Sequence, residues 1–317
     1  MPHAGMGIGL AAVARPAYLT SGRARDLGEH REVADLRRRT WDVLDTAVEA
    51  GVDYVDVARS YGRAEEFLAD WLHARPGVRV EVGSKWGYRY VGDWRLDAPT
   101  HEVKDHSLAA FLRQRNETNA LLGNRLSVYH VHSATLETGV LDDPPLHKAL
   151  AALRDSGIAV GVSTSGPDQG AVVRRALQVS AGGRPLFTSF QSTWNVLETS
   201  AAPALAEAAA SGARVIVKEP VANGRLAPGG GDDAPGAGRV AELAAELGVG
   251  TDVLAVAAAL AQPWATTVLS GAVTPDQLRS NVGATALALP AAVREELADL
   301  AEEPTAYWTA RSRRTWS

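Results

Sequence analysis

Four polar side chains stand at or just after the ends of three successive apolar runs, and together they could transfer a proton. Asp56 closes the first run and Tyr61 follows it, while Lys85 and His132 close the next two. A tyrosine has a pKa of about 10, which is too high for ready proton exchange at neutral pH, but a neighbouring ammonium lowers it. Lys85 would therefore make Tyr61 a usable acid and base, and Asp56 would hold Lys85 in place. His132 would hydrogen-bond a carbonyl oxygen.

Each of these residues also has an ordinary structural explanation. Asp56 could cap the following turn, and Tyr61 could pack in a loop. A lysine that closes a buried strand is costly unless a carboxylate pairs with it, so Lys85 and Asp56 could form a purely structural ion pair. The catalytic interpretation depends on all four side chains, including His132, meeting at one place. It therefore requires a fold that brings the ends of successive strands together.

The pattern of apolar residues predicts such a fold, because eight strand-like runs alternate with helix-like segments. We expect strands at residues 7–13, 52–57, 78–85, 126–132, 158–163, 186–191, 214–218 and 265–270. We expect helices at residues 40–50, 63–72, 103–122, 145–155, 169–180, 203–211, 239–247, 251–262, 274–282 and 290–302. Repeated strand–helix units imply a parallel sheet. Eight of them favour an α/β fold of the (β/α)8 TIM barrel type, as a single domain over residues 1–317.

A closed barrel would bring the four side chains together, because the carboxyl ends of its successive strands are neighbours at one rim. The competing doubly wound sheet usually carries a Gly-x-Gly-x-x-Gly motif after its first strand. Gly5, Gly7 and Gly9 lie before or inside the first strand and do not form that motif. The barrel is therefore the favoured architecture.

Several segments outside the regular elements carry expectations of their own. The connection over residues 14–39 is longer than usual, which favours a functional role. The Gly-rich segment near residues 228–238 is expected to be a mobile loop, and residues 303–317 a C-terminal tail. The arginines that gather at residues 37–39, before the expected first helix, and at residues 311–314 are interpreted as solvated surface.

Composition limits the class of protein. The 317 residues carry a formal net charge of −5, which gives no basic surface for nucleic acid. The absence of cysteine excludes disulfides, iron–sulfur clusters and cysteine-bound zinc. We see neither a signal peptide nor an apolar run near the ~20 residues needed to cross a bilayer. We therefore expect a cytoplasmic protein without membrane or nucleic-acid partners.

The four residues also stand in motifs that resemble those of the aldo-keto reductase family. The first motif reads Asp56-Val-Ala-Arg-Ser-Tyr61-Gly-Arg-Ala-Glu65, the second Gly83-Ser-Lys85, and the third Tyr129-His130-Val-His132. His132 matches better than His130 because it lies nearer the end of its strand. The resemblance covers nearly the whole chain. It implies an NAD(P)(H)-dependent oxidoreductase that reduces an aldehyde or ketone, or oxidises the alcohol, with Tyr61 as general acid and base.

The resemblance further implies a nicotinamide cofactor bound across the barrel rim without a Rossmann domain. The cofactor would be NADP or NAD, with NADP favoured. The positions that match the family's cofactor site are Ser163, Thr164, Gln191, Lys218, Glu219, Pro220, Gly224, Leu226, Ser270, Gly271, Ala272, Gln277 and Asn281. Backbone amides at the helix start after Ser270 would suit phosphate oxygens.

Three positions depart from the family's cofactor pattern. Thr164 stands where an asparagine is usual, and Lys218 stands where a tyrosine commonly stacks on the nicotinamide. Val273 occupies the place of a basic residue that meets the 2′-phosphate in NADP-using relatives, although Arg279 could substitute for it. These departures put the cofactor assignment in more doubt than the catalytic one.

The substrate is less determined than the chemistry. Trp86, Arg59 and Trp194 are the candidate substrate-binding residues, and Tyr88, Tyr307 and Trp308 could also line a pocket. Arg59 could instead pair with Glu65 or Glu66. An aromatic rim with arginines would accept a sugar, a polar aldehyde or an aryl aldehyde. The small-molecule carbonyl or alcohol is the one partner we expect, and the oligomeric state is left open.

Two alternatives stay open from the sequence. The same barrel could be a regulatory or sensor protein that binds the cofactor and turns over little. It could also be a metal-dependent isomerase or hydrolase that uses His130, His132 and Asp56, although a dedicated set of carboxylate ligands is not evident. We therefore expect no metal.

Overall fold

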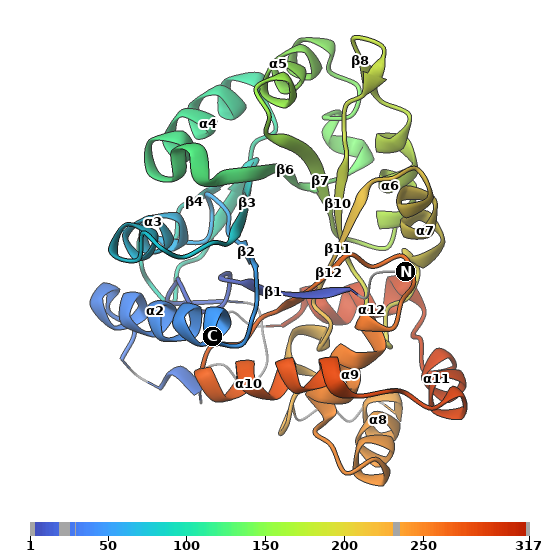
Figure 1. The fold of residues 1–317 in the computed structure, drawn as a ribbon. Helices are drawn as coiled ribbons and strands as arrows, with labels where there is room; N and C mark the ends of the chain where they lie inside the picture. The colour runs from blue at the N-terminus through green and yellow to red at the C-terminus, as the bar shows by residue number, and fades with distance from the viewer. Residues whose placement is uncertain (1–3, 19–25, 29, 231–234, 315–317) are drawn as a thin grey trace.

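Eight parallel strands form a closed barrel in the order β1–β12–β11–β10–β7–β6–β3–β2 (Figure 1). The computed structural model of the chain describes residues 4–18, 26–28, 30–230 and 235–314. The barrel strands are β1 (Gly5–Gly9), β2 (Tyr54–Asp56), β3 (Glu81–Trp86), β6 (Leu126–Ala134), β7 (Ala159–Thr164), β10 (Ser189–Thr193), β11 (Arg214–Lys218) and β12 (Thr267–Ser270). The predicted (β/α)8 barrel is therefore confirmed.

Helices surround the strands on the outside, as the view along the barrel shows (Figure 1). They are α2 (Val33–Glu49), α3 (Ala64–Ala74), α4 (Leu108–Leu122), α5 (Pro144–Asp155), α6 (Gln169–Leu177), α7 (Ala202–Ala210), α8 (Pro235–Glu246), α9 (Thr251–Leu260), α10 (Pro275–Gly283), α11 (Ala291–Ala298) and α12 (Pro304–Ser312). Side-chain caps fix several of their starts. Ser107, Asp143 and Thr274 each accept a backbone N–H three residues on, at the starts of α4, α5 and α10.

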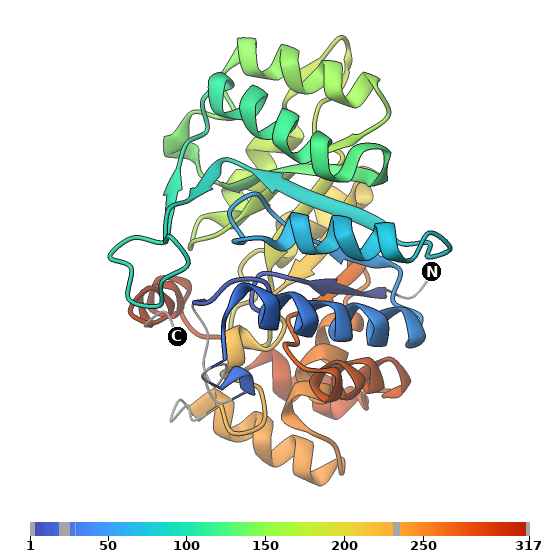
Figure 2. The same ribbon diagram turned by 90° about the vertical axis from the view of Figure 1, so that its left-hand side faces the viewer.

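Two antiparallel hairpins lie outside the barrel. One pairs β4 (Tyr88–Tyr90) with β5 (Glu102–Lys104), and the other pairs β8 (Ser180–Ala181) with β9 (Arg184–Pro185). The β4–β5 hairpin follows directly on β3, so it stands at the carboxyl ends of the strands. Figure 2 shows the barrel from the side, with this hairpin and α12 at the same end. That end is the rim at which the sequence placed its candidate site.

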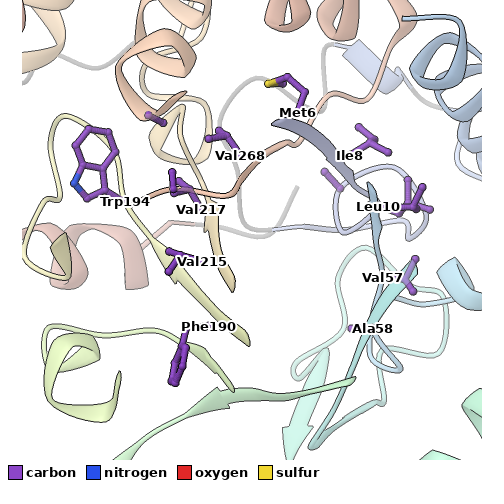
Figure 3. Packing of buried hydrophobic residues seen from close by; sticks show 14 of the residues in the cluster. Met6, Ile8, Leu10, Val57, Ala58, Phe190, Trp194, Val215, Val217 and Val268 are labelled. Carbon is purple, nitrogen blue, oxygen red and sulfur yellow. The ribbon is translucent and has the colours of Figure 1, made fainter. Parts of the chain in front are cut away.

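Side chains alternate between the barrel interior and the layer under the helices. Tyr54, Ile216 and Leu269 come from three strands and form a small cluster of their own. A Cβ added to Gly83 of the neighbouring strand would meet the Tyr54 hydroxyl at 1.9 Å, so only glycine fits there. Residues of the opposite face, such as Val215 and Val217 of β11, join the large outer core (Figure 3). The same alternation decides which side chains reach the rim.

The outer core holds the helices onto the barrel. Helix α3, which follows the first motif, buries Phe67, Leu68, Trp71 and Leu72 on one face. Each such side chain contributes about 1.5–3 kcal/mol when it is fully removed from water. The loop between β2 and α3 is therefore anchored at both ends, which fixes the part of the chain that carries Tyr61.

Some expected boundaries are wrong, for physical reasons. Strand β1 ends at Gly9 because the next residues, 10–13, are buried in a turn and not in the sheet. Helix α2 begins at Val33, well before the expected residue 40. The prediction missed its first turns because they are mostly polar and show little helical periodicity of apolar residues. The arginines at 37–39 thus lie within this helix. Strand β10 spans Ser189–Thr193, whereas a strand was expected at 186–191. The prediction began too early because Leu186 and Phe187 are apolar and buried although they precede the strand.

Three further segments differ from the expectation in their regular structure. The expected helix over 103–122 contains the end of β5 and a helix that starts only at Leu108. Within the expected loop 228–238, helix α8 begins at Pro235, and residues 231–234 lie outside the described residues. The expected tail contains α12, so it has a helix of its own. That residues 228–230 move remains a prediction.

No single helix in the described ranges is long and apolar enough to span a membrane, although the bent pair Gly236–Glu246 and Thr251–Leu260 meets the length and composition test when taken together.

Candidate active site

The four side chains singled out in the sequence lie together at the rim. Lys85 Nζ donates a hydrogen bond to Asp56 Oδ2 and a second one, of 2.9 Å, to the Val57 carbonyl oxygen. The same ammonium lies 4.7 Å from the centroid of the Tyr61 ring. The rings of Tyr61 and His132 meet edge to face at 5.5 Å. Alternation along β2, β3 and β6 thus delivers Asp56, Lys85 and His132 to one place, and the loop between β2 and α3 brings Tyr61 there.

The Lys85–Asp56 pair is almost completely buried, with side-chain exposures of 1% and 4%. Burial lowers the pKa of Lys85, and the charge and hydrogen bond of Asp56 oppose that shift. Asp56 Oδ1 also accepts a 2.8 Å hydrogen bond from Gln191 Nε2. Both oxygens of the carboxylate therefore have donors, as a buried charge requires.

The pKa of Tyr61 lies well above its ordinary value, which differs from the sequence-based expectation. Burial is the main cause, and the charge of Asp56 raises the pKa further, while Arg15 lowers it. The expected lowering by Lys85 does not prevail, because Asp56 pairs with that ammonium. Among the described residues, none hydrogen-bonds the Tyr61 hydroxyl. At neutral pH this hydroxyl is protonated and can donate.

His132 is a neutral imidazole at the edge of the Tyr61 ring. Burial, together with the charges of Lys85 and Arg15, holds its pKa well below the ordinary value. Strand β6 has an irregular register between Val131 and Ala134, and Ser133 there has a φ of 49°. Such a bulge changes the direction of the neighbouring side chain. The bulge sets how His132 stands beside Tyr61.

A cavity of about 580 Å³ opens over these groups and continues to the far side of the rim. Tyr61, His132 and Asp56 line it at one end, and Lys85 lies beneath the Tyr61 ring. The predicted cofactor residues that line the cavity are Ser163, Gln191, Lys218, Glu219, Pro220, Gly224, Ser270, Gly271, Ala272, Gln277 and Asn281. The structure thus gathers most of the predicted positions around one space.

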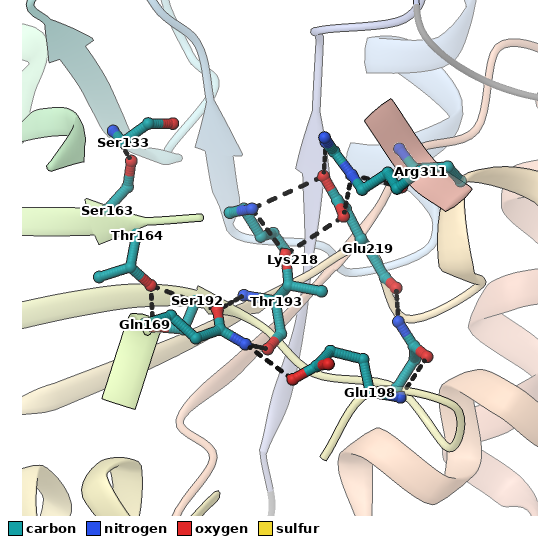
Figure 4. A network of polar contacts seen from close by, with 12 residues as sticks. Ser133, Ser163, Thr164, Gln169, Ser192, Thr193, Glu198, Lys218, Glu219 and Arg311 are labelled. Atoms are coloured by element: carbon teal, nitrogen blue, oxygen red, sulfur yellow. Dashed lines mark hydrogen bonds and ion pairs between the residues drawn. The ribbon is translucent and has the colours of Figure 1, made fainter. Parts of the chain in front are cut away.

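A second charged cluster forms the wall after β11 (Figure 4). Arg311 of α12 binds both carboxylate oxygens of Glu219, at 2.5 Å from Nη2 and 3.1 Å from Nε. Lys218 Nζ donates to Thr193 Oγ1 at 2.7 Å and lies 3.6 Å from Glu219 Oε1. Burial lowers the pKa of Lys218 to about 8. The pKa of Glu219 falls to about 2, because Arg311 and Lys218 outweigh the effect of burial.

The backbone of this wall is strained where the charges meet. Glu219, Ala222 and Asn223 have φ values of 58°, 48° and 55°, in the region that favours glycine. Each such residue costs on the order of 1 kcal/mol or more. The bonds from Arg311 to Glu219 and to Asn223 Oδ1 hold the strained turn in place.

The end of the cavity at β12 and α10 is rich in side-chain hydrogen bonds. Ser270 Oγ donates to Asn281 Oδ1 at 2.7 Å, and Asn281 Nδ2 donates to Asp252 Oδ2 at 2.8 Å. Gln277 Nε2 donates to Asp26 Oδ2 at 2.7 Å. This end therefore presents carboxylates that the sequence reasoning did not single out.

Trp86, Arg59 and Trp194 were predicted to bind substrate, and none of their side chains lines the cavity. Trp86 follows Lys85 in β3, so alternation turns its side chain outward, where it packs on Phe111. Arg59 forms ion pairs with Glu65 and Glu117. The sequence had offered Glu65 or Glu66 as its partner, so the pairing with Glu65 was anticipated and that with Glu117 was not. Trp194 packs edge to face on Trp264.

Two predicted cofactor residues also lie outside the cavity lining. Thr164 follows Ser163 in β7, so it faces the helix layer, where it hydrogen-bonds Ser192 Oγ at 2.7 Å and Gln169 Oε1 at 3.4 Å. Leu226 is buried in the outer core. Alternation along the strand, applied to Thr164, would have excluded that side chain from the sequence alone.

The sequence reasoning missed several residues of the reacting end. Arg15 stacks on the Tyr61 ring at 4.9 Å and pairs with Glu102 of β5 at 2.9 Å. Arg311 was taken for solvated surface, yet its side chain is 21% exposed and lines the cavity. The unusual length of the connection that contains Arg15 was the one available signal.

The described residues contain no group of three or more His, Cys, Asp or Glu side chains placed to hold a metal ion. His130, considered above as a ligand, instead pairs its Nε2 with Ser189 Oγ at 2.9 Å. Burial lowers the pKa of His130 to about 3, so it is neutral. It supports the barrel interior beneath the site.

Comparisons with known proteins bear on the family and the fold. The model of the aldo/keto reductase family matches residues 30–302. A search of curated proteins found no match. Aldo-keto reductase AKR11C1 from Bacillus halodurans, solved in its holo form, has a TM-score of 0.69 and 20% identity, over 94% of this chain and 92% of that one.

A second similar structure is the glycerol dehydrogenase AKR11B4 from Gluconobacter oxydans. Its TM-score is 0.69 and its identity 19%, over 95% of this chain and 92% of that one. At this level of identity the two structures show the fold alone, while the family model matches most of the sequence. The chain therefore belongs to the aldo/keto reductase family, and it is an NAD(P)-dependent oxidoreductase.

Proposed function

We propose that this enzyme reduces an aldehyde or ketone, or oxidises the corresponding alcohol, with Tyr61 as the general acid and base. The observation that carries the proposal is the position of Tyr61. It lines the cavity beside His132 and above the buried Lys85–Asp56 pair. A protonated phenol and a neutral imidazole at one point suit the oxygen of a carbonyl group.

Each residue has a role that follows from its surroundings. The substrate oxygen would accept hydrogen bonds from Tyr61 and from His132, whose Nε2 has no partner among the described residues. A bound reduced nicotinamide supplies the hydride to the carbonyl carbon. Tyr61 gives its proton to the oxygen in the same direction of reaction, and Lys85 stabilises the phenolate that remains. Asp56 is a positioning residue, since it holds Lys85.

The cavity residues fit a nicotinamide dinucleotide. Ser163 and Gln191 lie on neighbouring strands next to the reacting end and would meet the carboxamide. Ser270, Gln277 and Asn281 lie at the far end and would meet the adenosine half. At that end, Asp252 is buried and lines the cavity, and its Oδ1 has no hydrogen-bond partner in the described part of the chain. An unsatisfied buried acceptor is consistent with a ligand that donates to it.

We propose a polar, hydroxylated carbonyl compound as substrate, such as a sugar or a small polar aldehyde. The wall of the reacting end carries two ion pairs, Arg15–Glu102 and Arg311–Glu219. Ion pairs offer donors and acceptors side by side, as hydroxyl groups require. An aryl aldehyde would displace water from these ion pairs without offering hydrogen bonds in its place, which is costly.

The experiment is a turnover assay of the purified chain with reduced NAD or NADP and a panel of aldehydes. We expect loss of the reduced-nicotinamide absorbance with polar aldehydes. Tyr61→Phe should lower turnover by about 10²-fold or more while cofactor binding is retained. Tyr129→Phe is the matched control, because this tyrosine is buried on the outer face of β6. Equal activity of Tyr61→Phe and wild type would contradict the proposal.

The alternative is a sensor barrel that binds cofactor and turns over little. Lys218, in place of a stacking aromatic residue, is the observation that favours it. A single-turnover assay separates the two functions. Fast reduction of a polar aldehyde by bound cofactor supports the enzyme, and tight binding without reduction supports the sensor.

A further inference from the structure

The two ends of the cavity differ in the charged side chains that line them. The cations among the described lining residues are Arg15, Lys218 and Arg311, and all three stand at the reacting end. At the far end, around β12 and the start of α10, the charged residues of the lining that the structure describes are carboxylates. They are Asp26, Asp252 and Asp276. At the reacting end the cations are paired with the carboxylates Glu102 and Glu219. A ligand that spans the cavity therefore meets mixed charge near Tyr61 and carboxylates at the far end.

Three backbone donors of the far end are already engaged. The Ala272 N–H donates to Ser270 Oγ at 3.2 Å, and the Val273 N–H donates to Gln277 Oε1 at 2.9 Å. The Gln277 N–H donates to the capping Thr274 Oγ1 at 3.3 Å. Pro275, at the first position of the helix, has no N–H. The expectation that this helix start offers amides to a phosphate is therefore not met by these three groups.

Acceptors, in contrast, are available there. Asp252 is 4% exposed, and its Oδ2 binds Asn281, while its Oδ1 has no partner among the described residues. Asp26 accepts from Gln277 through one oxygen. A ribose diol and an adenine amino group are hydrogen-bond donors and suit such a surface. A phosphate monoester has only acceptor oxygens and a charge of about −1.5 to −2 at neutral pH, so carboxylates repel it.

Two arginines of the described ranges lie near this end without lining the cavity. Arg279 is 58% exposed in its side chain and pairs with Asp276 at 3.0 Å. Arg39 donates to the backbone oxygen of Asp26 at 3.5 Å. Neither removes the charge of Asp252, and Arg39 contacts the main chain and not the carboxylate.

We infer that the far end is built for the unphosphorylated adenosine of NAD(H), with Asp26, Asp252 and Asp276 discriminating against the 2′-phosphate of NADP(H). The inference rests on the proposed oxidoreductase function and reverses the preference for NADP expected from the sequence. It assigns the three aspartates as specificity-determining residues of the cofactor site.

The first experiment measures binding to the full chain by titration calorimetry, with no substrate present. NAD⁺ should bind at least about tenfold more tightly than NADP⁺, as expected for like charges brought together. Adenosine 5′-monophosphate and adenosine 2′,5′-bisphosphate isolate the far end, because they differ only by the 2′-phosphate. The monophosphate should bind more tightly, and the difference should shrink at high salt.

The second experiment removes the negative charge. The double variant Asp26→Asn and Asp276→Asn should lose most of the discrimination, whereas Asp299→Asn, an exposed residue outside the cavity lining, should keep it. Asp252→Asn should also weaken it, and its folding is checked by thermal unfolding.

The outcomes separate this inference from the function on which it rests. Equal or tighter binding of NADP⁺ by wild type would overturn the inference and leave the oxidoreductase function standing. Discrimination that survives the double variant and Asp252→Asn would overturn the assignment to these aspartates. Binding of neither dinucleotide would contradict the proposed function itself.

Discussion

Two lysine–carboxylate pairs face each other across the rim, one buried and one half-buried, and they are built differently. Lys85 and Asp56 lie on adjacent strands, and the pair is closed by Val57 and Gln191. Lys218 has a carboxylate neighbour, Glu219, that Arg311 already binds through both oxygens.

The difference separates the two roles. The Lys85–Asp56 pair has all its partners within the barrel and holds one ammonium in a fixed place beneath Tyr61, as the proposed proton transfer requires. A lysine whose neighbour is shared with Arg311 leaves positive charge on the cavity wall, beside the strained turn over residues 219–223. The first pair depends on the barrel alone, and the second depends on α12 as well.

The largest effect in this comparison should come from Lys85→Met. Asp56 would remain buried without its cation, which costs about 3–5 kcal/mol of unfolding free energy, and turnover should fall with it. Urea unfolding and the aldehyde assay measure the two effects. Lys148→Met, at an exposed position on α5, is the control. A loss of less than about 1 kcal/mol would show that the pair behaves like a surface ion pair.

A smaller loss is expected from Arg311→Met. Glu219 would keep Lys218 and the Thr193 hydroxyl as partners, so the cost should be about 1–3 kcal/mol. Cofactor affinity should fall too, because the strained turn loses its anchor. Arg313→Met, on the exposed side of the same chain end, tests whether any arginine there matters. If Arg311→Met lowers the free energy of unfolding as much as Lys85→Met does, Glu219 depends on Arg311 as strongly as Asp56 depends on Lys85.

An effect of similar size, seen only as a change of stability with pH, is carried by Lys218. Its pKa is about 8 in the folded chain against an ordinary value of 10.5. Between these values the unfolded chain binds more protons, so the free energy of unfolding rises with pH. Wild type should gain about 1–3 kcal/mol from pH 7 to about pH 10 relative to Lys218→Met. Denaturant unfolding of both proteins at the two pH values checks this. A constant difference between them would show that folding does not lower the pKa of Lys218.

The same comparison explains what the sequence could and could not predict. Asp56, Lys85 and His132 end successive strands, so the rule that strand ends meet at one rim was sufficient to place them. Glu219 was expected from its position after β11. Its partner Arg311 lies 92 residues further along and is reached only through the tertiary packing of α12. No local pattern marks such a residue.

Other errors arose because the alternation of side chains along a strand was not applied to every candidate residue. Trp86 and Thr164 each follow a residue assigned to the site, and alternation sends a neighbour to the opposite face. The start of α2 was missed because surface positions carry little periodic signal. Asp26 and Asp252 lie in or near helices that run outside the barrel, so the sequence alone could not predict that they line the cavity.

The closure of the barrel has a consequence for how the protein is made. Strand β1 pairs with β2 on one side and with β12 on the other, in a register that joins Gly5 to Thr267. During synthesis β12 leaves the ribosome about 260 residues after β1, so one edge of β1 has no hydrogen-bonding partner for most of that time. A nascent chain in this state is open to pairing with other chains. Its yield in cells should therefore depend on the rate of translation and on chaperones.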